Sequence, residues 1–152
     1  MAARLPALFL SAFLAAADIA HAQPSGGTIQ VEGVWARRAA MIRSGDSKAG
    51  SGSSAAYAKL VNRGTESDAL VAVASDAATA AEIHESYQES GMSMMRAVAR
   101  IDVPAGKAVE LKPGGYHVML LNLMRDLKAG ETLSLVLHFE KAGRIPVHAT
   151  VK

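Results

Sequence analysis

Apolar and polar residues alternate along several short stretches of this chain, and residues that favour turns separate these stretches. In Leu133–Phe139 a leucine or phenylalanine occupies every second position. This period of two is typical of a β-strand with one face on a core. Similar patterns predict further strands at Thr28–Glu32 with Val34–Arg37, Ala55–Asn62, Ala69–Ala74, Ile83–Tyr87, Met95–Val103, Gly115–Leu121 and Pro146–Val151. The alanine-rich Ala77–Ala81 suits a helical turn too short to be stable alone, so the pattern predicts a domain that is almost entirely β.

The turns between these stretches indicate how the strands connect. Pro104–Gly106 and Lys112–Gly115 are Pro/Gly turns, and Ser90-Gly91 suits a hairpin. Residues 44–54 are rich in Gly and Ser, a composition that predicts a mobile loop. Several short strands at this spacing predict an all-β fold, an antiparallel sandwich or Greek-key barrel.

The first residues carry the pattern of an export signal. Arg4 precedes an apolar run over Leu5–Ala17, and Ala20-His21-Ala22 is a small-x-small cleavage site. The run is shorter than the roughly 20 apolar residues that span a bilayer, and no transmembrane segment is predicted in the mature protein. We therefore expect a signal peptide at residues 1–22, cleaved near Ala22, a disordered leader at 23–27 and one β-domain at 28–152.

The composition excludes several classes of function. The chain has no cysteine, so it forms neither disulfides nor the thiolate sites that blue-copper and CuA proteins need. Its formal net charge of +2 comes from scattered residues, without the clustered basic face of a nucleic-acid-binding protein. No Ser/His/Asp arrangement, carboxylate pair or phosphate-binding glycine loop is evident, so the sequence predicts a protein that is not an enzyme.

Methionine and histidine carry the candidate chemistry. The clustered methionines are Met92, Met94, Met95, Met119 and Met124. Thioether and imidazole groups together suit copper(I), a soft ion, whereas Mg²⁺ and Ca²⁺ prefer carboxylates. Period-two alternation places His117 and Met119 on one face of a strand, roughly 7 Å apart. An antiparallel hairpin could bring His84 and Met95 together before the chain returns to His117.

Other interpretations of these residues remain open at this point. Histidine on a half-buried strand is often simply packed, and methionine is a routine filler of irregular gaps. Met92 and Met94 are candidate auxiliary ligands, although Met95 is favoured. A metal-free interaction module of the immunoglobulin-like type would place His84 and His117 far apart, or bury them with hydrogen-bond partners.

The spacing of the histidines and methionines resembles a known metal motif. His84, ten residues, Met95, twenty-one residues and then His117-x-Met119 reproduce the motif of the PCuAC family of periplasmic copper chaperones. The similarity extends over about Val34–Val151, including Trp35-Ala36-Arg37, Ala56-Tyr57, Asn62, Glu82–Glu85, Met95-Arg96 and Leu111–His117.

This resemblance implies the fold, the site and the role. It implies a cupredoxin-like β-barrel in the periplasm, with His84, Met95, His117 and Met119 as the ligands of copper(I). It also implies delivery of copper toward the CuA centre of cytochrome c oxidase, with the CuA subunit and a Sco-type thiol protein as partners. A periplasmic copper buffering or resistance protein is the alternative, because it would need the same site.

Overall fold

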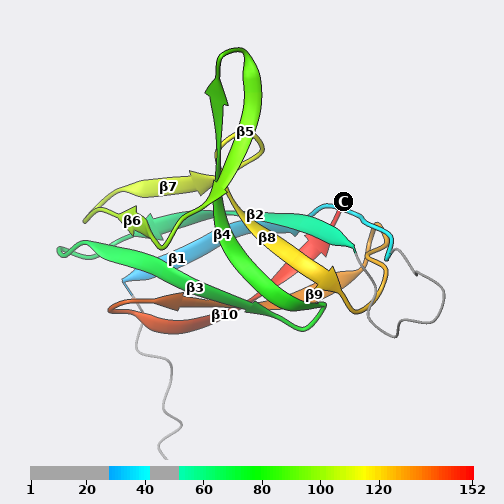
Figure 1. Ribbon diagram of the computed structural model, residues 1–152. Coiled ribbons are helices and arrows are strands. Elements are labelled where there is room, and N and C mark those ends of the chain that lie inside the picture. Colours follow the sequence, from blue (N-terminus) through cyan, green and yellow to red (C-terminus); the bar gives the residue numbers. More distant parts are fainter. Residues whose placement is uncertain (1–27, 42–51) are drawn as a thin grey trace, which may run out of the picture.

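The computed structural model describes residues 28–41 and 52–152, which form ten β-strands (Figure 1). The strands are β1 (Ile29–Ala36), β2 (Ser53–Asn62), β3 (Asp68–Ser75), β4 (Ala78–Glu89), β5 (Met92–Ala97), β6 (Ile101–Val103), β7 (Ala108–Leu111), β8 (Tyr116–Leu123), β9 (Thr132–Phe139) and β10 (Gly143–Val151). The described residues contain no helix that is long and apolar enough to span a membrane. The predicted signal peptide, the predicted leader and most of the predicted Gly/Ser loop lie outside the described residues.

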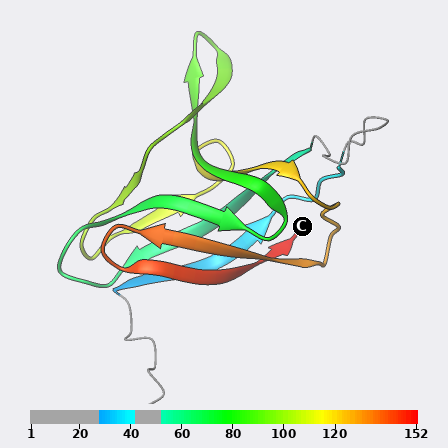
Figure 2. The ribbon, with the colours of Figure 1, turned by 60° about the horizontal axis from the view of Figure 1, so that its bottom comes forward.

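All the strands belong to one sheet that curls into an open barrel. The order is β5-β4-β8-β2-β1-β10-β9-β3-β6, and β7 pairs with the second half of β2. β3 and β4 follow each other in the chain and lie side by side (Figures 1 and 2). No backbone pairing joins these two described strands, so the barrel is not closed. The prediction of an all-β fold is confirmed.

One strand pair departs from the predicted antiparallel arrangement. β1 and β10 run parallel, with Trp35 opposite Thr150 and Ala36 opposite Val151. These strands come from the two ends of the described chain, so no tight hairpin fixes their relative direction. The other eight pairings between strands are antiparallel.

Three local predictions were wrong for identifiable reasons. The predicted strand Met95–Val103 is two strands, because β5 pairs with β4 whereas β6 pairs with β3. Ala77–Ala81 forms no helical turn; β4 begins at Ala78, whose Cα partner on β8 is Leu123. Two serines at the end of the predicted Gly/Ser loop already belong to β2, opposite Leu120 and Leu121 of β8. Tertiary pairing overrides local composition in each case.

The hairpin of β4 and β5 projects from the barrel (Figures 1 and 2). Its two-residue turn is Ser90-Gly91, with φ of 51° and 78°, so both central residues have the positive φ of a type I′ turn. The predicted hairpin at Ser90-Gly91 is thus confirmed. Every residue of β5 is exposed, so the tip of the hairpin adds little to the core.

The hydrophobic core and the buried side chain of Asn62 support the barrel from which this hairpin projects. Leucines from β2, β3, β8 and β9 are fully buried, among them Leu60, Leu70 and Leu120. Asn62 is 1% exposed and makes three hydrogen bonds, to the backbone of Glu66, Val103 and Gly64. Because its amide is fully paired, this buried polar side chain stabilises the loop after β2.

Candidate metal centre

The register of β4, β5 and β8 brings the four predicted ligands to one face of the sheet. His84 pairs with His117 on β8, and the centroids of the two imidazole rings are 5.7 Å apart. Met119 lies two residues after His117, and Met95 pairs with Ser86, two residues after His84. Side chains at paired positions, and at every second position, share a face. The sheet therefore collects these residues although 33 positions separate His84 from His117.

Each nitrogen of the His84 ring has a different environment. Nε2 lies 2.9 Å from Oε2 of Glu82, and because a carboxylate only accepts, Nε2 carries the proton and donates it. Nδ1 is then left with a free electron pair. It is buried and has no hydrogen-bond partner among the described residues. A buried acceptor without a partner costs about 1–3 kcal/mol, and a metal ion at this atom would remove that cost.

His117 has its ring fixed in a complementary way. Its Nδ1 lies 3.0 Å from the carbonyl oxygen of Gly115 and donates to it, since a carbonyl only accepts. The lone pair of Nε2 is then available to a metal ion, the arrangement in which an outer hydrogen bond orients a histidine ligand. The side chain is 5% exposed and its ring centroid is 6.4 Å from that of Tyr57. Packing thus holds the ring in one orientation.

The two faces of the β4–β5 hairpin separate Met95 from its neighbours. Met95 pairs with Ser86, on the face of His84, whereas Met94 pairs with Tyr87 and Met92 with Glu89 on the opposite face. Met95 is 54% exposed and Met94 is 40% exposed. Both methionines are exposed, so exposure does not distinguish them. Only Met95 lies on the face of the histidines, and the register therefore favours Met95 over Met94 as a ligand of the same ion.

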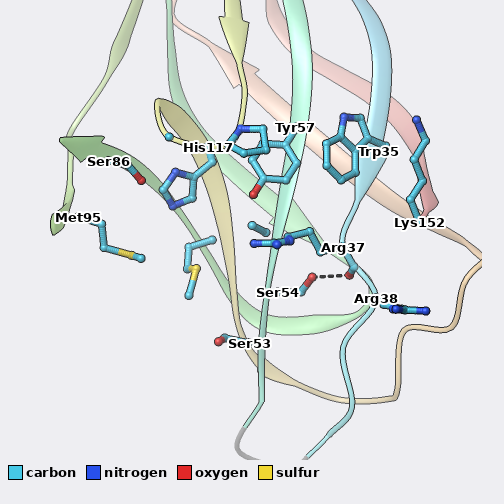
Figure 3. Close-up of a pocket in the computed structure, with 14 residues that line it drawn as sticks. Trp35, Arg37, Arg38, Ser53, Ser54, Tyr57, Ser86, Met95, His117 and Lys152 are labelled. Atoms are coloured by element: carbon cyan, nitrogen blue, oxygen red, sulfur yellow. Dashed lines mark hydrogen bonds between the residues drawn. The ribbon is translucent and has the colours of Figure 1, made fainter. Parts of the chain in front are cut away.

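A cavity opens beside these side chains (Figure 3). Its volume is about 920 Å³, and Met95, His117 and Met119 line one side of it. Figure 3 shows the Met95 side chain extending toward the side of the cavity on which His117 lies. His84 does not line the cavity, but its ring lies 5.7 Å from that of His117, which does. The face is therefore accessible to a ligand or partner.

The donor set fits a soft monovalent ion better than a hard one. In residues 28–41 and 52–152, no three His, Asp or Glu side chains gather as a metal site. The side chains that accompany the two histidines on this face are the thioethers of Met95 and Met119, which suit copper(I) and serve Mg²⁺ or Ca²⁺ poorly. Two imidazoles and two thioethers are all neutral, so the bound charge would be that of the ion alone.

Comparison with known proteins assigns the chain to a family. The family model described as "Putative lipoprotein LpqE-like" matches residues 29–151. This chain belongs to the LpqE-like family. A relative named "Putative lipoprotein Lxx21020", from Leifsonia xyli subsp. xyli, is 33% identical over 82% of this LpqE-like chain and 69% of its own length. RP573 of Rickettsia prowazekii is 33% identical over 57% of this chain and 49% of its own length.

Solved structures similar to this LpqE-like protein confirm the predicted resemblance to PCuAC domains. The apo PCuAC domain from PmoF1 is 29% identical with a TM-score of 0.64, covering 83% of this chain and 94% of that domain. The copper-bound PCuAC domain from PmoF2 is 25% identical with a TM-score of 0.63, covering 83% and 93%. CuI-DR1885 from Deinococcus radiodurans is 31% identical with a TM-score of 0.58, covering 86% and 85%. The predicted cupredoxin-like fold class is confirmed by these neighbours.

The sequence prediction missed one residue of this site in the LpqE-like chain. Glu82 was noted only as part of the family resemblance, yet its carboxylate orients His84. The sequence pattern that could have identified Glu82 is the period of two, because Glu82 lies two residues before His84 and so shares its face of the strand. The same argument placed His117 and Met119 on one face. The alternation along β4 could therefore have placed Glu82 beside the site.

Proposed function

We propose that this protein is a copper(I)-binding metallochaperone and not an enzyme, with His84, Met95, His117 and Met119 as its metal ligands. The observation that carries the proposal is the buried Nδ1 of His84, which has no partner among the described residues and lies on a ring 5.7 Å from that of His117. A metal-free module would be expected to pair this nitrogen. The PCuAC domain from PmoF2 and DR1885, both similar in fold, have copper-bound structures.

Exposure of Met95 supports transfer rather than permanent storage. Met95 belongs to an edge strand whose residues are all exposed, and it faces the cavity beside His117. An incoming ligand can therefore reach the ion while His84 and His117 still hold it. The thioether of Met95 would leave first, and the half-buried His84 and the buried His117 last. Stepwise exchange of this kind avoids release of free copper.

The site of action that we propose is the periplasm. The support is the export pattern over residues 1–22, together with a family and one relative that are named as putative lipoproteins. The proposed destination of the copper is the CuA centre of cytochrome c oxidase, with the CuA subunit and a Sco-type thiol protein as partners. The absence of cysteine from this chain fits a role as donor, because thiolates on the acceptor would draw copper(I) away from thioethers.

A competition titration tests copper binding. The domain starting at Gln23 is titrated with copper(I) against a chromophoric chelator, beside the double variant His117→Ala/Met119→Ala. We expect one tight equivalent that the variant loses. The matched control is Met124→Ala/His148→Ala, which removes the same two residue types outside the cavity and should keep the equivalent. No competition by the unsubstituted domain would refute the proposal.

A transfer assay then distinguishes the chaperone from a copper buffer. The copper-loaded domain is mixed with an apo, reduced CuA fragment of cytochrome c oxidase, and the CuA absorption is followed after oxidation. A chaperone loads the fragment faster than an equal concentration of copper held by the chelator. Retention of the copper by the domain would identify a buffering protein.

A further inference from the structure

The cavity beside the metal face is strongly asymmetric in charge. Arg37, Arg38 and Lys152 line the side away from Met95, and no described residue that lines the cavity is Asp or Glu. The nine ion pairs found among the described residues include none of these three cations. Three neutral candidate ligands, Met95, His117 and Met119, also line the cavity, and among the described side chains that line it none carries a negative charge to balance these cations. The cavity therefore attracts anions.

Hydrogen bonds fix the backbone from which these cations extend. The amide of Arg37 donates to the Ala55 carbonyl at 2.9 Å, and its own carbonyl accepts from Ser54 Oγ at 2.6 Å. The amide of Arg38 donates to the Lys152 carbonyl at 2.9 Å, so the ends of β1 and β10 are joined beside the cavity. These bonds fix where the side chains leave the backbone beside the cavity.

The side chains present these charges to the cavity in distinct ways. Figure 3 shows the Arg37 side chain running beneath Tyr57 toward the side of His117. The Lys152 ammonium lies 5.3 Å from the centre of the Trp35 ring, a distance at which the ring face attracts the cation. Guanidinium groups bind carboxylates in a bidentate manner. The cavity thus offers a carboxylate site within the same space as Met95 and His117.

We propose that this cavity binds the carboxylate end of a small anionic thiol that carries copper(I) to the site, a proposal that rests on the copper function above. A volume of about 920 Å³ falls in the range of small-molecule sites, roughly 300–1,000 Å³. The carboxylates contact Arg37 and Lys152 while the sulfur-bound ion meets Met95 and His117. The sulfur–copper bond breaks as bonds to imidazole nitrogen and thioether sulfur form. Copper stays copper(I), and the thiolate leaves with its electron pair.

Trp35 allows the cavity to be tested without copper. It is the only tryptophan in the chain and it lines the cavity, so its fluorescence reports on occupancy. We expect reduced glutathione, the probe, to change the emission of the apo domain in a saturable way that its diethyl ester does not reproduce. Arg37→Gln/Lys152→Gln should abolish the response. Arg144→Gln, which removes one positive charge at the other end of β10, should retain it. A response that is unchanged in the double variant would overturn the proposal.

The decisive experiment compares the rates at which two copper(I) donors load the domain. From the copper(I)–glutathione complex, Arg37→Gln/Lys152→Gln should load about tenfold more slowly than the unsubstituted domain, because electrostatic attraction raises association rates by at least that factor. From the copper(I)–acetonitrile complex, which is a cation, the variant should load at least as fast as the unsubstituted domain, which also shows that the variant is folded. Equal rates from glutathione would overturn the inference. Failure of the unsubstituted domain to load from either donor would instead refute the copper function, and the fluorescence titration would still decide whether the cavity binds the thiol.

Discussion

His84 and His117 are direct cross-strand partners on β4 and β8, with ring centroids 5.7 Å apart, and the two rings are fixed through different nitrogens. Glu82 holds Nε2 of His84, whereas the Gly115 carbonyl holds Nδ1 of His117. The free lone pairs are thus on Nδ1 of one ring and Nε2 of the other. This relationship gives the proposed copper site its geometry, and each prediction about metal binding depends on it.

The two faces of the β4–β5 hairpin predict a sharp difference between adjacent methionines. Met95→Leu should weaken copper(I) binding at least about tenfold, or about 1.4 kcal/mol, because the sulfur on the His84 face is lost. Met94→Leu is the matched control, since its side chain lies on the opposite face. The affinities are measured by competition with a chromophoric chelator. A larger loss in Met94→Leu than in Met95→Leu would refute this assignment.

Glu82 should matter to the metal although it is not a proposed ligand. Glu82→Ala removes the acceptor that orients His84 and should lower copper(I) affinity about tenfold, the lower end of effects seen for such outer partners. Glu85→Ala is the control, because Glu85 bonds Arg96 on the other face of the hairpin. If both variants bind copper(I) as tightly as the unsubstituted domain, Glu82 has no positioning role.

Asp68, which does not line the cavity at the proposed copper site, is predicted to determine stability. Burial raises the pKa of this carboxyl, but backbone N–H groups of Lys141, Ala142 and Ala69 donate to it and hold the pKa below its ordinary value of 3.8. Asp68→Asn should therefore lower the free energy of unfolding at pH 7 by about 2 kcal/mol, measured in urea. Asp102→Asn, which breaks an exposed pair with Arg100, should change it by less than about 1 kcal/mol.

The same carboxyl predicts a pH dependence of stability. Because the pKa of Asp68 is lower in the folded protein than in the unfolded chain, its contribution is complete well above pH 3.8 and is lost as the pH falls through the folded-state value. The gap in unfolding free energy between the unsubstituted protein and Asp68→Asn should thus shrink below about pH 4. A gap that stays constant down to pH 2 would contradict this account of Asp68.

The buried Asn62 side chain provides a second test of what stabilises the barrel. Asn62→Ala leaves the carbonyls of Glu66 and Val103 and the amide of Gly64 without their partner. We expect a loss of about 2–4 kcal/mol in the free energy of unfolding, measured by urea denaturation. Gln30→Ala, which removes an exposed bond to Arg63, is the control and should have little effect. A loss below about 1 kcal/mol for Asn62→Ala would show that water replaces these bonds.

The fold was largely predictable where apolar and polar residues alternate along a strand. It was not predictable where only pairing with a neighbouring strand decides the structure. Leu133–Phe139 shows a clear period of two and makes up all of β9 except Thr132. By contrast, Ala78 belongs to a strand only because β8 lies beside it, and the short strand β7 was missed. The parallel pair of β1 and β10 joins distant parts of the chain, a relationship that no local pattern carries.

The candidate site was predictable as a set of residues but not as a set of atoms. Spacing placed His117 and Met119 together, and the Ser90-Gly91 turn supplied the hairpin for Met95. Which nitrogen of each histidine is free depends on Glu82 and on the Gly115 carbonyl, whose positions follow from the folded backbone. The cationic side of the cavity likewise depends on β1 meeting β10, so it was invisible in the sequence.

X-ray absorption at the copper edge tests the central claim most directly. The domain loaded with one equivalent of copper(I) should show two nitrogen and two sulfur neighbours, and Met119→Leu should lose one sulfur while Met124→Leu keeps both. That result would support copper(I) held by His84, Met95, His117 and Met119. A spectrum with only nitrogen or oxygen neighbours, or one that is unchanged in Met119→Leu, would contradict it.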